Sequence, residues 1–388
     1  MVNQENIDFI NENKEKSVAA LALLLSKKPE LDKTFILNQV NGWQKAKQKL
    51  PEFFNTNNII FPPSRAMEQC SSEETAIYKN QLVSGKNLLD LTGGFGIDSY
   101  YFSKKFENIT YIEQNEDLLK IAEHNFRQLN ATNIQVQSVS AEQFLDNNQQ
   151  TFDVVYIDPD RRNEQQRLYQ LLDCSPNIIE ILPKLFKITD KVLIKTSPFL
   201  DISKTISELK QVEKCVVVAV KNECKEVLYL LSKSYRATPK IVAVNLGSGQ
   251  AELVFTITQE KAAKVVFSKP LSYLYEPNAA IMKSGGFNIV AEYFKVKKIA
   301  PQSHLYTSDE LIHDFPGRIF KITFCSNYNQ KEFAKSKVTK ASVTLRNFPD
   351  SIEKLKTKLR LKDGGTTYLF GTRKEDNHPI IIVAEKCS

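Results

Sequence analysis

With 388 residues, the chain is long enough for two or three domains that each have a hydrophobic core. Its apolar and charged fractions, 42% and 25%, are those of a soluble globular protein, and its longest apolar run, Val18–Leu25, is too short to span a bilayer. The polar N-terminus has no apolar signal core, so we expect a cytoplasmic protein without membrane contact.

Six cysteines are scattered along the chain without a C-x-x-C pair, and the four histidines are equally dispersed. This spacing argues against a zinc site and against a disulfide framework. We therefore expect reduced thiols and no bound metal.

The N-terminal part, residues 1–60, is predicted to be helical. Apolar residues such as Ile36, Val40 and Trp43 recur at helical spacing, and prolines interrupt the pattern. A polar linker with two prolines follows over residues 55–65, and a short helix then leads into the next domain.

From Lys86 onward, apolar strands alternate with helices. The expected strands are residues 87–91, 109–113, 134–139, 152–159 and 191–198. Such alternation with short connections predicts a doubly wound, mostly parallel sheet. Residues 214–232 hold two more strand-like runs with too little chain between them for a parallel crossover, so we expect an antiparallel pair that closes the sheet edge. Residues 61–235 thus have the outline of a Rossmann-like class I methyltransferase core, which alone does not prove a function.

The alternation stops after residue 235. Residues 236–317 are expected to form a connecting α+β segment, with a hairpin over a Gly-Ser-Gly turn and a short helix that has Pro277 in its first turn. Residues 318–388 follow the order strand, helix, strand, helix, strand, strand, which predicts a compact α+β module.

Positive charge is concentrated near the C-terminus. Between residues 329 and 362 there are ten Lys/Arg against three acidic residues, a balance of +7 that equals the excess of the whole chain. A polyanionic partner is one explanation, and a solvated lysine face on a surface helix is the other. For residues 353–362 alone, the solvated face is the simpler explanation.

The first expected strand ends in a glycine-rich turn, DLTGGFG, residues 90–96. A dinucleotide fingerprint requires a third glycine where this chain has Ser99, and a P-loop requires Gly-Lys-Ser/Thr, which is absent. The carboxylate of Asp90 instead suits the amino group of a ligand such as S-adenosylmethionine. A purely structural glycine turn explains this segment equally well when it is considered alone.

The ends of the second and third expected strands favour S-adenosylmethionine as the ligand. Glu113 ends the second strand, where a carboxylate commonly accepts both ribose hydroxyls of a nucleotide. Ala141 and Glu142 follow the third strand and would flank an adenine ring and accept its amino hydrogen. We therefore predict that S-adenosylmethionine is bound by Asp90, Thr92, Gly93, Gly94, Gly96, Glu113, Ala141 and Glu142.

The fourth strand ends in DPDRR, which begins at Asp158. In methyltransferases that act on amino groups, a polar residue followed by proline at this point accepts both hydrogens of the target nitrogen and directs its lone pair at the methyl carbon. We predict Asp158, Pro159 and Arg161 as catalytic, and Arg162 as a contact to a phosphate or carboxylate of the substrate. The alternative is an Asp-Pro turn with two surface arginines.

These motifs resemble those of the Bacteroidetes-type class I methyltransferases that carry a C-terminal THUMP-like domain. Two distal stretches share the resemblance: YLYEPNAAIMKSGG and LRNFPDSIEKLKTKLRLKDGGTTYLFGT. The resemblance covers most of the chain. It implies an S-adenosylmethionine-dependent enzyme, and RNA as the substrate, because THUMP modules serve RNA-modifying enzymes. In this interpretation Lys354, Lys356, Lys358 and Arg360 grip the RNA backbone.

One feature departs from the pattern. Many base-amino methyltransferases have an aromatic residue shortly after the proline, whereas Asp160 and Arg161 follow Pro159 here. Methylation of a pyrimidine C5 atom needs a thiolate, and no cysteine lies near the fourth or fifth strand end. We therefore expect methylation of an RNA base nitrogen. The alternatives are a protein or small-molecule substrate, or a non-catalytic RNA-binding protein with a vestigial fold; the oligomeric state stays open.

Overall fold

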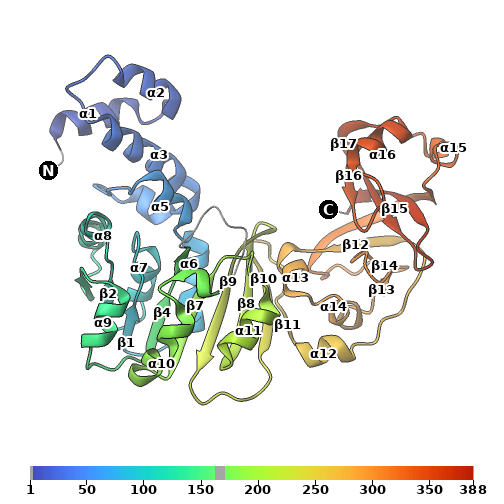
Figure 1. Ribbon diagram of the computed structural model, residues 1–388. Coiled ribbons are helices and arrows are strands. Elements are labelled where there is room, and N and C mark those ends of the chain that lie inside the picture. Colours follow the sequence, from blue (N-terminus) through green and yellow to red (C-terminus); the bar gives the residue numbers. More distant parts are fainter. Residues whose placement is uncertain (1–2, 162–170, 388) are drawn as a thin grey trace. The chain divides into compact units, whose positions relative to one another are not determined.

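The computed structural model describes residues 3–161 and 171–387, which form two compact units (Figure 1). The first unit contains residues 1–213 and 228–236, and the second contains residues 214–227 and 237–388. The chain therefore passes between the units three times, twice within a single β-hairpin and once after residue 236.

The first unit begins with a helical region, as the sequence predicts. Its helices are α1 (Gln4–Asn13), α2 (Val18–Leu25), α3 (Lys33–Lys49), α4 (Pro51–Asn55), α5 (Ser64–Gln69) and α6 (Glu73–Leu82). Side chains of Asn3, Ser17 and Asp32 cap the first three helices, since each accepts a backbone N–H of the following turn. Leu21, Leu25, Ile36 and Val40 then form a small core of their own.

Two buried amides fasten the segment between α4 and α5 to the rest of the unit. The Gln39 side chain donates to the Phe61 carbonyl and accepts from the Phe61 N–H, both at 2.8 Å. Asn125 accepts from the Ile60 N–H at 2.9 Å and donates to the Ile60 carbonyl at 2.8 Å. Because these amides satisfy the backbone of an irregular segment, the segment can be buried against the sheet domain.

The core of the first unit is a parallel sheet with β4 and β1 at its centre. Its parallel strands are β1 (Asn87–Asp90), β2 (Asn108–Ile112), β3 (Ile134–Gln137), β4 (Val154–Ile157) and β7 (Lys191–Thr196). The intervening helices are α7 (Ile97–Ser103), α8 (Glu116–Gln128), α9 (Ala141–Asn147), α10 (Ile178–Ile188) and α11 (Ile202–Leu209). The spatial order β7-β4-β1-β2-β3 reverses direction between β1 and β4, the point where such sheets bind ligands.

A short antiparallel pair, β5 (Asp160–Arg161) with β6 (Cys174–Ser175), lies beside the end of β4, and a 3₁₀ turn (Leu171–Asp173) leads into it. The long strands β8 (Val212–Val220) and β9 (Glu223–Ser232) are neighbours joined by two residues only. Both connecting residues, Lys221 and Asn222, have positive φ angles of 50° and 66°. These angles are typical of a type I′ turn, so the predicted antiparallel pair is a tight hairpin.

This hairpin does not end the sheet, in contrast to the sequence-based expectation. Beyond β8 lie β10 (Lys240–Leu246), parallel to β8, and β11 (Leu253–Thr256), antiparallel to β10. The reason is visible in β8, where Cys215–Ala219 are all buried and their backbone needs partners on both sides. The predicted hairpin over Gly-Ser-Gly is the β10–β11 pair.

The second unit contains a seven-stranded sheet in the order β13-β14-β12-β15-β18-β17-β16. The strands are β12 (Tyr273–Pro277), β13 (Lys297–Lys298), β14 (Tyr306–Ser308), β15 (Gly317–Asn327), β16 (Lys340–Leu345), β17 (Lys362–Arg373) and β18 (Pro379–Lys386). The helices are α12 (Ile257–Ala262), α13 (Ala279–Ser284), α14 (Ile289–Tyr293), α15 (Gln330–Phe333) with a 3₁₀ turn (Ala334–Ser336), and α16 (Ile352–Leu359).

The predicted order of elements after residue 317 is confirmed, from β15 to β18. Pro277 is different: it ends β12, and Asn278 caps α13 by accepting the Ile281 N–H at 3.0 Å. An asparagine cap satisfies a free N–H of the helix, which a proline at this point cannot do. The division into four regions at residues 60, 235 and 317 stays a prediction.

The two-sided clamp of Asn125 gives a test of how the N-terminal helices are held. Asn125→Ala would leave the buried Ile60 N–H and carbonyl without partners, so we expect a loss of about 1–3 kcal/mol in the free energy of unfolding. Urea denaturation measures this loss. Lys120→Ala, on the same helix with 68% of its side chain exposed, is the control and should change stability by no more than about 0.5 kcal/mol. Equal stabilities of the two variants would contradict the proposed clamp.

Candidate active site at the strand ends

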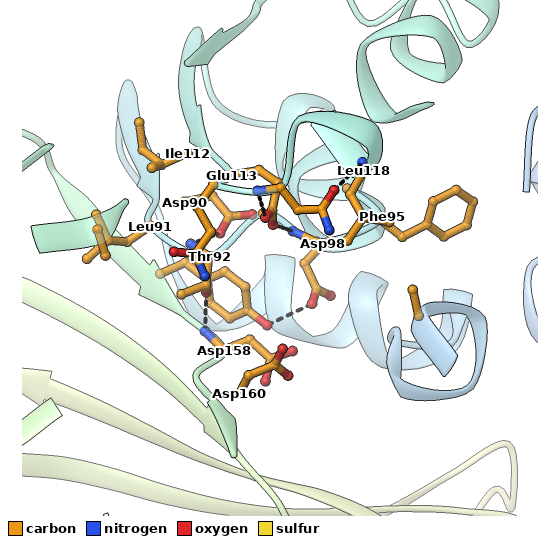
Figure 2. Close-up of a pocket in the computed structure, with 18 of the residues that line it drawn as sticks. Asp90, Leu91, Thr92, Phe95, Asp98, Ile112, Glu113, Leu118, Asp158 and Asp160 are labelled. Carbon is orange, nitrogen blue, oxygen red and sulfur yellow. Dashed lines mark hydrogen bonds between the residues drawn. The ribbon is translucent and has the colours of Figure 1, made fainter. Parts of the chain in front are cut away.

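A cavity of about 280 Å³ opens at the carboxyl ends of β1, β2 and β4, near the lower end of the size range of ligand sites (Figure 2). It is closed on one side by α5 and the residues that follow it, Ala66 and Gln69 to Ser71. The residues predicted to bind the cofactor all line it: Asp90, Thr92, Gly93, Gly94, Gly96, Glu113, Ala141 and Glu142.

Asp90, the last residue of β1, is buried with 1% of its surface exposed. One carboxylate oxygen accepts the Thr92 N–H at 3.1 Å, and the other accepts the Ser99 hydroxyl at 2.5 Å. Burial raises the pKa of Asp90 to about 7, although these hydrogen bonds oppose the rise. The charge of Asp90 therefore changes near neutral pH.

The glycine turn is fixed to β2 by Glu113. One Glu113 oxygen accepts the Gly94 N–H and the other accepts the Asn115 N–H, both at 2.7 Å. Gly96 precedes α7 with φ 84°, and a Cβ there would lie 2.6 Å from the Phe126 ring, so only glycine fits. Each Glu113 oxygen keeps a lone pair with which it can accept a ligand hydroxyl.

Asp158 follows β4, and its N–H donates to the Thr92 hydroxyl at 2.6 Å, which joins the ends of β1 and β4 (Figure 2). Its carboxylate forms an ion pair with Lys195 of β7, which follows Ile194, the partner of Ile157 in the β4–β7 pair. Burial raises the pKa of Asp158, and the Lys195 ammonium partly offsets the rise.

The other predicted residues of this segment differ in position. Pro159 is half-buried and is not among the residues that line the cavity. The backbone of Arg161 belongs to β5, and Arg162 lies outside the described residues.

Sequence reasoning missed a buried network in the wall of the cavity. Asp98 of α7 forms an ion pair with Lys79 of α6 at 3.2 Å and accepts the Ser71 and Tyr156 hydroxyls, each at 2.7 Å. Burial alone would raise the pKa of Asp98, but Lys79 and Lys195, together with the Tyr156 and Ser71 hydroxyls, outweigh burial and hold the pKa below its ordinary value. The only available signal was an acidic residue in the first turn of a helix, which usually serves the helix itself.

The cavity wall is acidic. Its described lining includes six carboxylate side chains and no lysine, arginine or histidine: Asp90, Asp98, Glu113, Glu142, Asp158 and Asp160. Lys79 and Lys195 lie behind this wall as partners of Asp98 and Asp158. A wall of this kind suits a ligand with positive charge and is a poor environment for phosphates.

The predicted RNA-contacting residues lie in the second unit, on or next to α16. Lys354, Lys358 and Arg360 are exposed, whereas Lys356 is half-buried and pairs with Asp363 at 2.5 Å. The Lys358 ammonium lies 3.8 Å from the centre of the Tyr328 ring. Lys356 is thus the one of these four residues that forms an ion pair among the described residues.

Within the described parts of the chain, no cluster of three His, Cys, Asp or Glu side chains is arranged to hold a metal ion. The same residues include no helix long and apolar enough to cross a membrane.

Three protein families match separate parts of the chain. Residues 74–223 match Conserved hypothetical protein 95, residues 273–316 match a ferredoxin-like domain, and residues 317–386 match the THUMP domain-like family. No curated protein matches the chain in sequence.

Solved structures give a match over the full length. A protein of Porphyromonas gingivalis W83, described as a "putative methyltransferase", has 27% sequence identity and a TM-score of 0.86, with 100% of both chains covered. Two methyltransferases resemble the chain only in part. TrmK of M. capricolum, with bound S-adenosylhomocysteine, has 14% identity and a TM-score of 0.34, covering 43% of this chain and 70% of its own. An rRNA methylase of Streptococcus thermophilus has 11% identity and a TM-score of 0.31, covering 41% and 94%.

The strand order β3-β2-β1-β4-β7-β9-β8, with the antiparallel β9 inserted before β8, defines a methyltransferase-type α/β fold, which confirms the predicted fold class. The chain carries this core together with a ferredoxin-like and a C-terminal THUMP-like domain, and it shares its fold over the full length with the Porphyromonas gingivalis protein.

The raised pKa of Asp90 gives a prediction about stability. The pKa rises from 3.8 to about 7 on folding, so the stabilisation by its bound proton is fully present below about pH 4 and is lost as the pH rises to about 7. Asp90→Asn cannot ionise. Its stability relative to the natural protein should therefore increase between about pH 4 and about pH 8.

Urea denaturation at several pH values measures this difference. Any constant loss from the altered Ser99 contact shifts the Asp90→Asn curve without changing its slope. Asp146→Asn, which removes an exposed carboxylate on α9, is the control and should parallel the natural protein. Parallel curves for Asp90→Asn as well would show that Asp90 is ionised throughout.

Proposed function

We propose that this protein is an S-adenosylmethionine-dependent methyltransferase that acts on a base nitrogen of an RNA. The observation that carries the proposal is the cavity at the β1–β4 switch point with six carboxylates and no basic residue among its described lining. S-Adenosylmethionine carries a sulfonium and an ammonium group, so an acidic cavity attracts it, whereas the phosphates of NAD or a nucleoside triphosphate would be repelled.

The roles of the lining residues follow from their positions. Ionised Asp90 would accept the ammonium group, and Glu113 would accept the ribose hydroxyls with its remaining lone pairs. Ala141 and Glu142, at the start of α9, would border the adenine. When bound, S-adenosylmethionine supplies a methyl group on positively charged sulfur.

Asp158 would orient the acceptor. Its carboxylate and the Pro159 carbonyl would accept the two hydrogens of an amino group, so that the nitrogen lone pair faces the methyl carbon. The Lys195 ion pair would hold the Asp158 carboxylate ionised for this purpose and fix its direction. Positioning of this kind supplies much of the rate of a displacement reaction.

RNA as the substrate is supported by two features of the C-terminal part. Residues 317–386 match the THUMP domain-like family, and residues 329–362 carry a net charge of +7. Exposed Lys354, Lys358 and Arg360 would contact phosphates. Lys356 would join them once it leaves its ion pair with Asp363. A protein or small-molecule substrate would not need this charge. We propose a cytoplasmic location for the enzyme.

Calorimetric titration with S-adenosylmethionine, and with NAD as the control ligand, tests the cofactor. We expect micromolar binding of S-adenosylmethionine alone. Because Asp90 ionises near neutral pH, its affinity should also rise between about pH 6 and about pH 8, and Asp90→Asn should bind weakly without this rise. Binding of neither ligand would instead favour a vestigial fold whose basic C-terminal module is the active part.

Asp158→Ala tests the acceptor site. We expect this variant to bind S-adenosylmethionine and to lose about 10²–10³-fold in the rate of methyl transfer, since an orienting group is removed. The rate is measured as the transfer of tritium from methyl-labelled S-adenosylmethionine to total RNA, which is isolated from cells that lack the gene for this protein. Asp146→Ala, which removes an exposed carboxylate, is the control.

Because Asp158→Ala also removes a partner of the Lys195 ammonium, the double variant Asp158→Ala/Lys195→Met is measured beside it. If the double variant also transfers methyl groups slowly, the loss of rate is due to the missing Asp158 carboxylate and not to the unpaired Lys195 ammonium. An undiminished rate of methyl transfer by Asp158→Ala would contradict the proposed role of Asp158. Methyl transfer to protein rather than to RNA would show that the substrate is a protein.

A further inference from the structure

The turn that follows β7, the strand next to β4, contains an exposed aromatic residue. β4 and β7 are parallel neighbours with Ile157 opposite Ile194, so the segments beyond both strands leave the same edge of the sheet. Asp158 follows β4, and Phe199 lies four residues beyond its partner Lys195. Phe199 therefore belongs to the same sheet edge as the proposed acceptor site.

The backbone around Phe199 is held in place. Leu200 donates its N–H to the Ser197 carbonyl at 3.4 Å, and Pro198 occupies the second position of this turn, where its fixed φ angle is favourable. Leu200 is buried with 6% exposure, and Asp201 caps α11 by accepting the Lys204 N–H at 2.7 Å. The turn thus presents residue 199 from a fixed position.

The Phe199 side chain itself is 64% exposed. A ring with this exposure adds little to the hydrophobic core, whereas the adjacent Leu200 supplies the packing of the turn. Single exposed apolar residues are common on proteins, so exposure alone carries no meaning. Here, however, the residue that follows Pro159 is Asp160, so the aromatic residue that many base-amino methyltransferases carry shortly after this proline is replaced by a carboxylate.

We propose that Phe199 provides the stacking surface for the target base, while Asp158 engages the amino group of that base. The inference rests on the proposed function and narrows its substrate to an unpaired nucleotide, because a base inside a duplex offers neither its face nor its free amino edge. Stacking on one ring tolerates any base, so selection among bases would fall to Asp158.

Phe199→Ala and Phe199→Trp test the proposal in the full-length protein. The readouts are the affinity for S-adenosylmethionine, the free energy of unfolding, and initial rates of tritium transfer against the concentration of total RNA from cells that lack the gene. Phe199→Ala should leave the first two unchanged and lower kcat/KM for RNA by about 5- to 150-fold, as loss of a base–aromatic stack does. Phe199→Trp should retain most of the activity.

Leu23→Ala is the matched control, since Leu23 is an apolar residue with 73% exposure on α2, and it should behave as the natural protein. Full activity of Phe199→Ala with RNA would overturn the stacking role and leave the proposed function intact. A natural protein that binds S-adenosylmethionine but methylates no RNA would overturn both. Equal losses in the alanine and tryptophan variants would also contradict stacking.

Discussion

The site depends on hydrogen bonds that join the ends of neighbouring strands. The Glu113 carboxylate holds the glycine turn after β1 against β2, and the Thr92 hydroxyl accepts the N–H of Asp158 at the end of β4. Each bond satisfies a backbone N–H that lies beyond the last hydrogen bond of the sheet and would otherwise have to bond to water. Because these groups are satisfied inside the protein, the cavity keeps its walls without a ligand.

Much of this arrangement follows from the sequence, since the ends of parallel strands meet at one edge of the sheet. Asp90, Glu113 and Glu142 were each placed after an apolar run, and all three line the same cavity. The extension of the sheet by β10 and β11 was not predicted, because a buried strand shows that it has two neighbours but does not identify them. The sequence places Pro277 in a first helical turn because proline favours that position, but proline is also tolerated at strand ends, where the structure has it.

The lysines behind the cavity could not be predicted. Lys79 and Lys195 lie 19 and 37 residues along the chain from their carboxylate partners, Asp98 and Asp158. Nothing in local spacing distinguishes them from the many solvated lysines of this chain. Their effect is electrostatic. They help to hold the pKa of Asp98 below its ordinary value and partly offset the rise that burial causes in the pKa of Asp158, whereas burial raises the pKa of Asp90 to about 7.

The β8–β9 hairpin has a consequence for how the two units can be separated. Residues 214–227 belong to the second unit, whereas Leu228–Ser232 of β9 return to the first. Removal of everything after residue 236 would strip β8 of β10 and leave a long apolar edge open to pairing with other chains. A truncation at residue 236 would therefore give an aggregation-prone fragment, because the two units share this strand pair.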